Sequence, residues 1–157
     1  MAHHLPPNDR WAWTERLCNC FLVRDPARTL ASLHARVGSF TLAETGLPQL
    51  VALFERQRDR SGRVPPVIDA RDVRSDPGRV LTALCEAIGI PFDEGMLSWP
   101  PGRRDTDGAW APHWYDVVES SMGFAPPSQE VVELDPSLQG MLETCVRLYD
   151  VLAAHRL

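Results

Sequence analysis

The sequence predicts an α/β fold in which a parallel sheet is flanked by helices. Short apolar runs at residues 20–24 and 67–70 alternate with longer segments of helical periodicity, an order of elements that is typical of parallel sheets. An Asp-Pro pair then follows each run, at 25–26 and at 76–77. Such a pair starts a helix, because aspartate caps the first turn and proline needs no N–H there. The 157 residues are enough for one domain with a buried core.

The first half of the chain divides into short elements. Residues 1–9 are interpreted as a strand remnant and a proline-containing loop, and residues 10–17 as a short helix. The strand at 20–24 leads into a helix from Pro26 to about Val37, which Gly38 ends. Thr41 and Glu44 have the spacing of a capping box.

A second helix is predicted to reach about Arg60, and its mixed-charge end, residues 55–60, is interpreted as a solvated surface. The strand at 67–70 is followed by a helix from Pro77, which Gly89 ends. Loops are predicted at 99–108 and 125–127. The last helix follows Asp135-Pro136, and its apolar stripe is assigned to core packing without chemistry. The stripe consists of Leu138, Met141, Leu142, Cys145, Leu148, Tyr149 and Leu152.

Composition limits the functions open to the chain. Its net charge of −5 argues against broad binding of nucleic acids or anionic membranes, so any phosphate site must be local. No apolar run has the length of a membrane span and no signal-peptide pattern is present, which predicts a cytoplasmic protein with reduced cysteines. Cys18 and Cys20 lack partners at zinc spacing, so no metal is expected, and Cys85 and Cys145 are predicted in the core.

Arg24 is the strongest candidate for a binding residue. It ends an apolar run directly before a helix start, where free backbone N–H groups and the positive end of the helix dipole favour a phosphate. Ser32 lies on the second turn of that helix. The alternative is that Asp-Pro merely starts a helix, and that Arg24 pairs with a carboxylate such as Asp25 or Asp69.

The sequence Arg24-Asp25-Pro26 followed by Ser32 resembles the motif with which sulfotransferases hold the 3′-phosphate of their donor, 3′-phosphoadenosine 5′-phosphosulfate. The resemblance implies that Arg24 and Ser32 bind this phosphate. The stretch His4-Leu5-Pro6 resembles the region where many sulfotransferases place the catalytic base, so His4 is the candidate for that role, with His3 as its competitor.

Two later stretches extend the resemblance. Residues 67–92 resemble the family's later strand and helix, and residues 110–115 resemble a bacterial branch that is sometimes found beside or fused to amino-acid aminotransferases. His113 in this stretch either lines an acceptor pocket or packs against Trp110 or Trp114. Arg103 and Arg104 either reach a phosphate or an acidic acceptor, or lie on the surface. The acceptor is taken to be an unidentified small molecule.

The resemblance implies a three-layer P-loop-type sheet, and the sequence departs from that pattern at one place. It has no G-x-x-x-x-G-K-[ST] loop, and all 16 basic residues are arginine, so no lysine can hold the 5′-phosphosulfate. We therefore expect one sulfotransferase-like domain over 1–157 that lacks the N-terminal strand, loop and helix. We expect weak or no activity from such a chain alone. Three explanations stay open for the incomplete sheet: the true start lies upstream, a partner chain or dimer covers the sheet, or the chain is marginally stable. The alternative is a non-catalytic remnant that binds a nucleotide or a protein.

Overall fold

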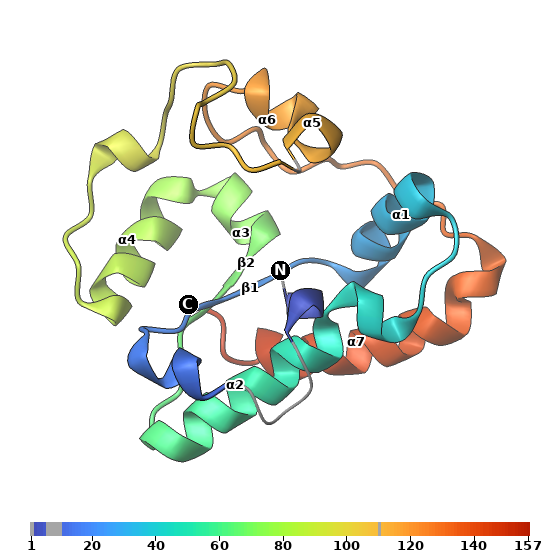
Figure 1. Cartoon of the computed structure of the whole chain (residues 1–157), viewed down its shortest axis with the longest axis horizontal. Coiled ribbons are helices and arrows are strands. Elements are labelled where there is room, and N and C mark those ends of the chain that lie inside the picture. The colour runs from blue at the N-terminus through green and yellow to red at the C-terminus, as the bar shows by residue number, and fades with distance from the viewer. Residues whose placement is uncertain (1, 6–10, 110) are drawn as a thin grey trace. The chain divides into compact units, whose positions relative to one another are not determined.

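The computed structural model describes residues 2–5, 11–109 and 111–157. The chain divides into two compact units, of which the first comprises Met1–Arg71 with Gln129–Leu157 and the second comprises Asp72–Ser128. Figure 1 shows the course of the chain through both. The prediction of one sulfotransferase-like domain over the whole length stays a prediction.

The sheet of the first unit consists of two parallel strands, β1 (Phe21–Val23) and β2 (Val67–Asp69). Phe21 pairs with Val67, and Val23 pairs with Asp69. Beside β2 the C-terminal residues continue the pairing, because Arg156 forms a parallel bridge with Val67 and the Leu157 N–H donates to the Val67 carbonyl at 3.0 Å. Parallel strands flanked by helices are the predicted α/β arrangement.

Three long helices accompany this sheet in the first unit, with α2 and α7 side by side (Figure 1). Of these, α7 packs against the other two helices and against both strands, and so forms the centre of the unit. The long helices are α1 (Pro26–Val37), α2 (Leu47–Ser61) and α7 (Gln139–Ala153). The short 3₁₀ helices of this unit are η1 (Ala2–His4), η2 (Ala12–Arg16), η3 (Leu42–Thr45) and η5 (Pro136–Leu138).

The predicted helix ends of α1 are confirmed. Asp25 Oδ1 accepts a hydrogen bond from the Arg28 N–H at 2.9 Å, and Pro26 is the first helical residue. At the other end Gly38, with φ of 76°, donates its N–H to the His34 carbonyl. These signals are local, since a cap needs only residues within one turn.

The predicted strand remnant at the N-terminus is wrong for residues 2–5. Residues Ala2–His4 form a 3₁₀ turn, closed by the Leu5 N–H on the Ala2 carbonyl at 2.9 Å. This turn packs against α2 and η3, and no strand lies beside it for an extended segment to pair with among the described residues. Residues 6–9, the rest of that prediction, lie outside the described residues.

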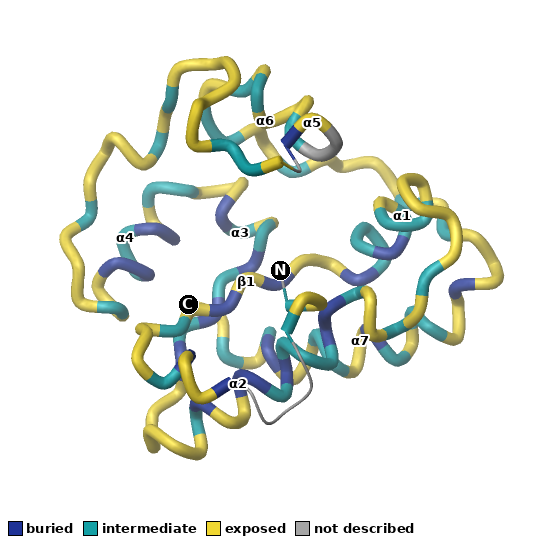
Figure 2. The backbone as a smooth tube through the Cα atoms, viewed as in Figure 1, coloured by how far each residue is buried: buried dark blue, intermediate teal, exposed yellow. Residues whose placement is uncertain are grey.

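The core of the first unit has two clusters (Figure 2). One lies between the sheet and the helices α2 and α7, where the rings of Phe21 and Phe54 meet edge to face at 5.4 Å. The other lies between α1, α2 and α7 and includes Leu30, Leu138 and Cys145. The apolar stripe predicted for the last helix is confirmed, and so are the buried positions of Cys85 and Cys145.

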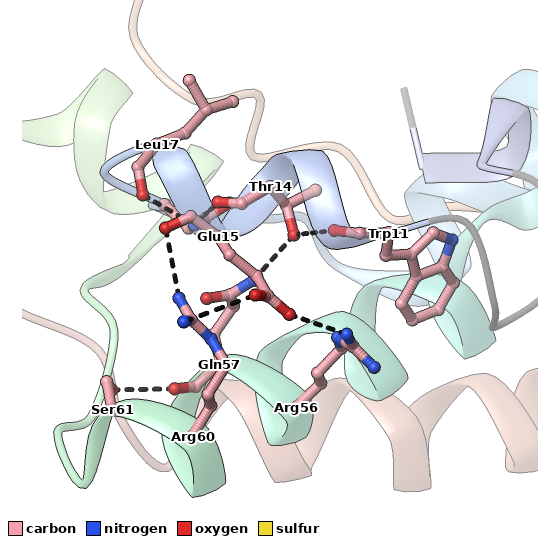
Figure 3. Close-up of polar contacts among 9 residues, drawn as sticks. Trp11, Thr14, Glu15, Leu17, Arg56, Gln57, Arg60 and Ser61 are labelled. Atoms are coloured by element: carbon pink, nitrogen blue, oxygen red, sulfur yellow. Dashed lines mark hydrogen bonds and ion pairs between the residues drawn. The ribbon is translucent and has the colours of Figure 1, made fainter.

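A polar network attaches η2 to α2 (Figure 3). The Gln57 amide donates to Thr14 Oγ1 at 2.8 Å, and the Thr14 hydroxyl donates to the Trp11 carbonyl at 2.6 Å. Next to this pair Glu15 forms ion pairs with Arg56 at 2.7 Å and with Arg60 at 3.5 Å. The interpretation of residues 55–60 as solvated surface holds for most of them, since four of the six are exposed. It misses Gln57, which is buried, and the ion pairs by which Arg56 and Arg60 hold η2.

The second unit is built on helices and loops. Its longest helix, α4, is capped as predicted, with Asp76 Oδ1 accepting the Arg79 N–H at 3.1 Å. An antiparallel bridge joins Ser98 to Gly123, and the Arg74 side chain donates to the carbonyls of Ala125 and Pro126. The helices here are α3 (Ala70–Ser75, which begins in the first unit), α4 (Pro77–Ile88), η4 (Glu94–Met96), α5 (Ala111–Trp114) and α6 (Asp116–Glu119). Within the described residues, no helix has the length and apolar character needed to cross a membrane.

Candidate functional site

The carboxyl ends of β1 and β2 lie at the same edge of the sheet, because the strands are parallel and Val23 pairs with Asp69. In open α/β sheets ligands bind outside this edge. Arg24 directly follows β1, and Asp69 is the last residue of β2. The fold therefore brings an exposed guanidinium-bearing residue and a buried carboxylate to one edge of the first unit.

The turn from β1 into α1 presents Arg24 away from the core. Phe21 and Val23 are buried, whereas Leu22 between them is 58% exposed and Arg24 is exposed as well, as the alternation of side chains along a strand requires. Asp25 then caps α1. The positive end of the α1 dipole thus lies next to Arg24, a combination that suits an anion.

Ser32 lies on the second turn of α1 and is exposed. It follows Asp25 by seven residues, almost two turns, so it lies on the same side of the helix about 10 Å further along the axis. Leu30, which is fully buried, marks the opposite side. Arg24 and Ser32 are therefore carried by one continuous strand–turn–helix segment, and both are exposed.

Arg28 lies on this same side of α1, one turn before Ser32. Its Nη2 donates to the Glu130 carbonyl at 2.7 Å, which ties the helix face to the segment that precedes η5. Sequence reasoning did not single out Arg28, because an arginine in a helix carries no signal of a partner 102 residues away.

Asp69 is almost completely buried, with 3% of its surface exposed. Its Oδ2 accepts the Tyr149 hydroxyl at 2.6 Å, and its Oδ1 accepts the Arg71 N–H at 2.7 Å. Nη1 of Arg156 lies 3.9 Å from Oδ2. The sequence suggested Asp69 only as a possible partner of Arg24. The structure gives this carboxylate three other partners.

Tyr149 packs against the core, as its place in the stripe predicts, and its hydroxyl also donates to Asp69. Burial, the hydrogen bond to Asp69 and the charges of Asp69 and Asp25 together raise the pKa of Tyr149 to about 12, and the charge of Arg156 opposes them. A tyrosine within an apolar stripe is itself a signal, since a buried phenol usually has a hydrogen-bond partner.

His4 is exposed at the end of η1, and its ring centroid lies 4.0 Å from that of His3. Burial lowers the pKa of His3, and so does the neighbouring His4, while Glu44 opposes the shift. The His3 main chain is seated on Gly46, where an added Cβ would lie 2.9 Å from the His3 nitrogen. His4 thus comes from an element packed on α2 and η3, separate from the turn that carries Arg24.

The remaining candidates lie in the second unit. The side chain of His113 lies outside what the structure describes. Arg103 and Arg104 are exposed, and the Arg104 N–H donates to Asp107 Oδ2 at 2.8 Å. Within the described part of the chain, no group of three or more His, Cys, Asp or Glu residues is arranged to hold a metal ion.

Comparison with known proteins gives a family for this chain. The model of the sulfotransferase domain matches residues 1–156. Among curated proteins, the branched-chain-amino-acid aminotransferase-like proteins 1 and 2 of Arabidopsis thaliana are 36% and 34% identical to it over 134 residues. These matches cover 85% of this chain and 24% of each relative, so the chain spans about a quarter of their length.

No solved structure matches the chain. The family match, in contrast, includes both strands, all the long helices and each of the three residues that the sequence singled out, His4, Arg24 and Ser32. The chain belongs to the sulfotransferase domain family.

Proposed function

We propose that this protein takes part in sulfuryl transfer from 3′-phosphoadenosine 5′-phosphosulfate to a small-molecule acceptor, and that Arg24 and Ser32 bind the donor's 3′-phosphate. The observation that supports this most is the β1–α1 turn. It combines an exposed arginine, an Asp-capped and Pro-started helix, and an exposed serine two turns along. The family match over residues 1–156 supports the same chemistry.

The residues of the turn fit a phosphate. A guanidinium forms paired, charge-assisted hydrogen bonds with phosphate oxygens, and a serine hydroxyl can donate one more. The net charge of the chain is −5, so attraction to the donor has to come from this local group of donors rather than from the whole surface.

For the transfer step we assign the role of general base to His4. An acceptor hydroxyl or amine attacks the sulfur, the bond from sulfur to the bridging phosphate oxygen breaks, and the proton of the acceptor passes to the His4 imidazole. Adenosine 3′,5′-bisphosphate leaves. A neutral imidazole is suited to this role near neutral pH.

The donor's 5′-phosphosulfate is negatively charged, and Arg24, Ser32 and His4 offer it little positive charge beyond what the 3′-phosphate uses. The 157 residues contain no lysine and no G-x-x-x-x-G-K-[ST] loop, the elements that usually cradle such a group. We therefore propose that the 157-residue chain transfers slowly or not at all alone, and that a further segment or a partner chain completes the site.

Calorimetric titration with adenosine 3′,5′-bisphosphate tests the binding half of this proposal. The unmodified chain should bind, and Arg24→Ala should weaken binding roughly tenfold or more, since a charged hydrogen bond contributes about 1.5–3 kcal/mol. Ser32→Ala should weaken it less. Arg79→Ala is the matched control, because Arg79 is an exposed arginine on the other Asp-Pro-capped helix.

The outcomes separate the two candidate functions. Binding that depends on Arg24 supports a donor site, and a sulfuryl-transfer assay on the same sample shows whether it is catalytic. Equal binding by the Arg24→Ala and Arg79→Ala variants would contradict the assigned phosphate site. No binding by any form favours the alternative, a module that binds a protein.

A further inference from the structure

Asp69 is the one acidic side chain that is buried among the described residues. A buried carboxylate is stable only when hydrogen bonds and opposite charge replace its hydration. Here the replacements come from three places: the Tyr149 hydroxyl on α7, the Arg71 N–H at the start of α3, and the Arg156 guanidinium near the C-terminus. Asp69 therefore ties three segments to the end of β2.

The end of β2 is also the neighbour of the proposed phosphate site. Val23 pairs with Asp69 in the parallel ladder, so their Cα atoms lie about 5 Å apart. Arg24 is the next residue along β1. The ladder therefore places Arg24 one residue beyond the position that pairs with Asp69.

Tyr149 connects the same edge to α1. The helix that carries it packs against α1, β1 and β2. The Tyr149 hydroxyl donates to Asp69, the residue that pairs with Val23 at the end of β1. The hydroxyl is thus held at the strand end next to Arg24, on a helix that also packs against α1.

We propose that Tyr149 and Asp69 are a positioning pair for the donor site: their hydrogen bond fixes the end of β2 against α7, and thereby holds the β1–α1 turn in the geometry that binds the 3′-phosphate. This inference rests on the proposed function. Neither residue touches the donor. They act through the backbone of Val23 and Arg24.

The variant Tyr149→Phe tests the pair, because it keeps the ring in the core and removes only the hydroxyl. We expect it to bind adenosine 3′,5′-bisphosphate three- to tenfold more weakly than the unmodified chain, at a temperature where both are folded. Thr14→Val is the matched control. It also removes one buried hydroxyl from the first unit, but at the η2–α2 contact, and should leave the affinity unchanged.

Hydrogen exchange of the ligand-free protein gives a readout that does not depend on the donor. In Tyr149→Phe the backbone amides of residues 24–29 should exchange faster than in the unmodified chain and in Thr14→Val. If the unmodified chain fails to bind the bisphosphate, the proposed function fails, while faster exchange at 24–29 still supports the pair as the element that holds this turn. Unchanged exchange at 24–29 in Tyr149→Phe would overturn the inference, whatever the affinity.

A second variant covers the case in which Tyr149→Phe does not fold. Asp69→Asn keeps the shape of the side chain but removes its charge, which weakens its interactions with the Tyr149 hydroxyl and with Arg156. It should increase exchange at 24–29 in the same direction. Where both variants fold, the double variant Tyr149→Phe/Asp69→Asn should bind the bisphosphate as tightly as the weaker-binding of the two single variants. The reason is that both substitutions act on the same interaction. If the loss of affinity in the double variant equals the sum of the losses in the two single variants, the two residues do not act as a pair.

Discussion

The side-chain amide of Gln57 donates a hydrogen bond to the Thr14 hydroxyl at 2.8 Å, and both side chains are buried. The same hydroxyl donates to the Trp11 carbonyl at 2.6 Å (Figure 3). One oxygen atom therefore accepts from α2 and closes the first turn of η2. This arrangement anchors η2 on α2.

Thr14→Val should destabilise the first unit. It leaves the Gln57 amide buried without its acceptor, and a buried polar group that loses its partner costs about 1–3 kcal/mol. Urea unfolding followed by tryptophan fluorescence measures this loss, since Trp11 lies in the core beside the network. Glu15→Gln is the comparison: it removes two partly exposed ion pairs, each worth about 1 kcal/mol or less and weaker in salt. A smaller loss for Thr14→Val than for Glu15→Gln would contradict this ranking.

Gly46→Ala should cost more than Gly62→Ala, although the two glycines flank the same helix in similar left-handed conformations, with φ of 76° and 66°. The left-handed backbone costs alanine about 1–2 kcal/mol in either place. At Gly46 the added Cβ would also lie 2.9 Å from the His3 nitrogen, whereas at Gly62 nothing lies within 4 Å. Urea unfolding gives both losses, and histidine ring signals in NMR spectra should change in the Gly46 variant alone. Equal losses and equal spectra would show that η1 is not seated on Gly46.

Asp25→Ala should lower the free energy of unfolding by about 1 kcal/mol, because it removes the side chain that accepts the Arg28 N–H at the start of α1. Asp25→Asn should restore most of that loss, since asparagine is an equally good cap. Thermal unfolding of the three proteins tests the cap. If the asparagine variant is as unstable as the alanine variant, the charge of Asp25 and not its hydrogen bond stabilises this turn.

Alkaline pH should weaken the fold through Tyr149. Its pKa is raised from 10.0 to about 12 in the folded chain, so the folded state keeps a proton that the unfolded state loses. The stabilising contribution is complete below about pH 10 and disappears as the pH rises to about 12. The sequence has no lysine and two tyrosines, so few other groups titrate in this range. Burial also raises the pKa of the Cys145 thiol above its usual value.

Urea unfolding at a series of alkaline pH values measures this loss. Tyr149→Phe removes the group that titrates, so its stability should fall less steeply over the same range. Tyr115→Phe is the matched control and should keep the slope of the unmodified chain. Identical slopes in all three proteins would mean that Tyr149 is not held by Asp69.

Much of the fold could be predicted because its signals are local. The caps of α1 and α4 use a carboxylate and an N–H three residues apart, and the glycines that end these helices act within one turn. The apolar stripe of α7 is likewise visible in the sequence as helical spacing. The family motif was recognised for the same reason, since Arg24 and Ser32 lie close together in the chain.

The sequence does not predict those contacts whose two residues lie far apart in the chain. The charged end of α2 has the pattern of a solvated surface, and only the fold shows Arg56 and Gln57 facing η2, more than 40 residues away. The place of Tyr149 in the core is predicted correctly, but the hydrogen bond of its hydroxyl to Asp69, 80 residues away, is not. For residues 2–4 the sequence predicts an extended segment, but the structure has a 3₁₀ turn. The turn packs on α2 and η3, and these contacts cannot be read from the local sequence.

A crystal structure of the chain with adenosine 3′,5′-bisphosphate tests the central proposal most directly. We predict that oxygen atoms of the 3′-phosphate lie within hydrogen-bond distance of the Arg24 guanidinium and of Ser32 Oγ, outside the carboxyl end of β1. A nucleotide bound at another place in the molecule, or one whose 3′-phosphate contacts neither Arg24 nor Ser32, would contradict it.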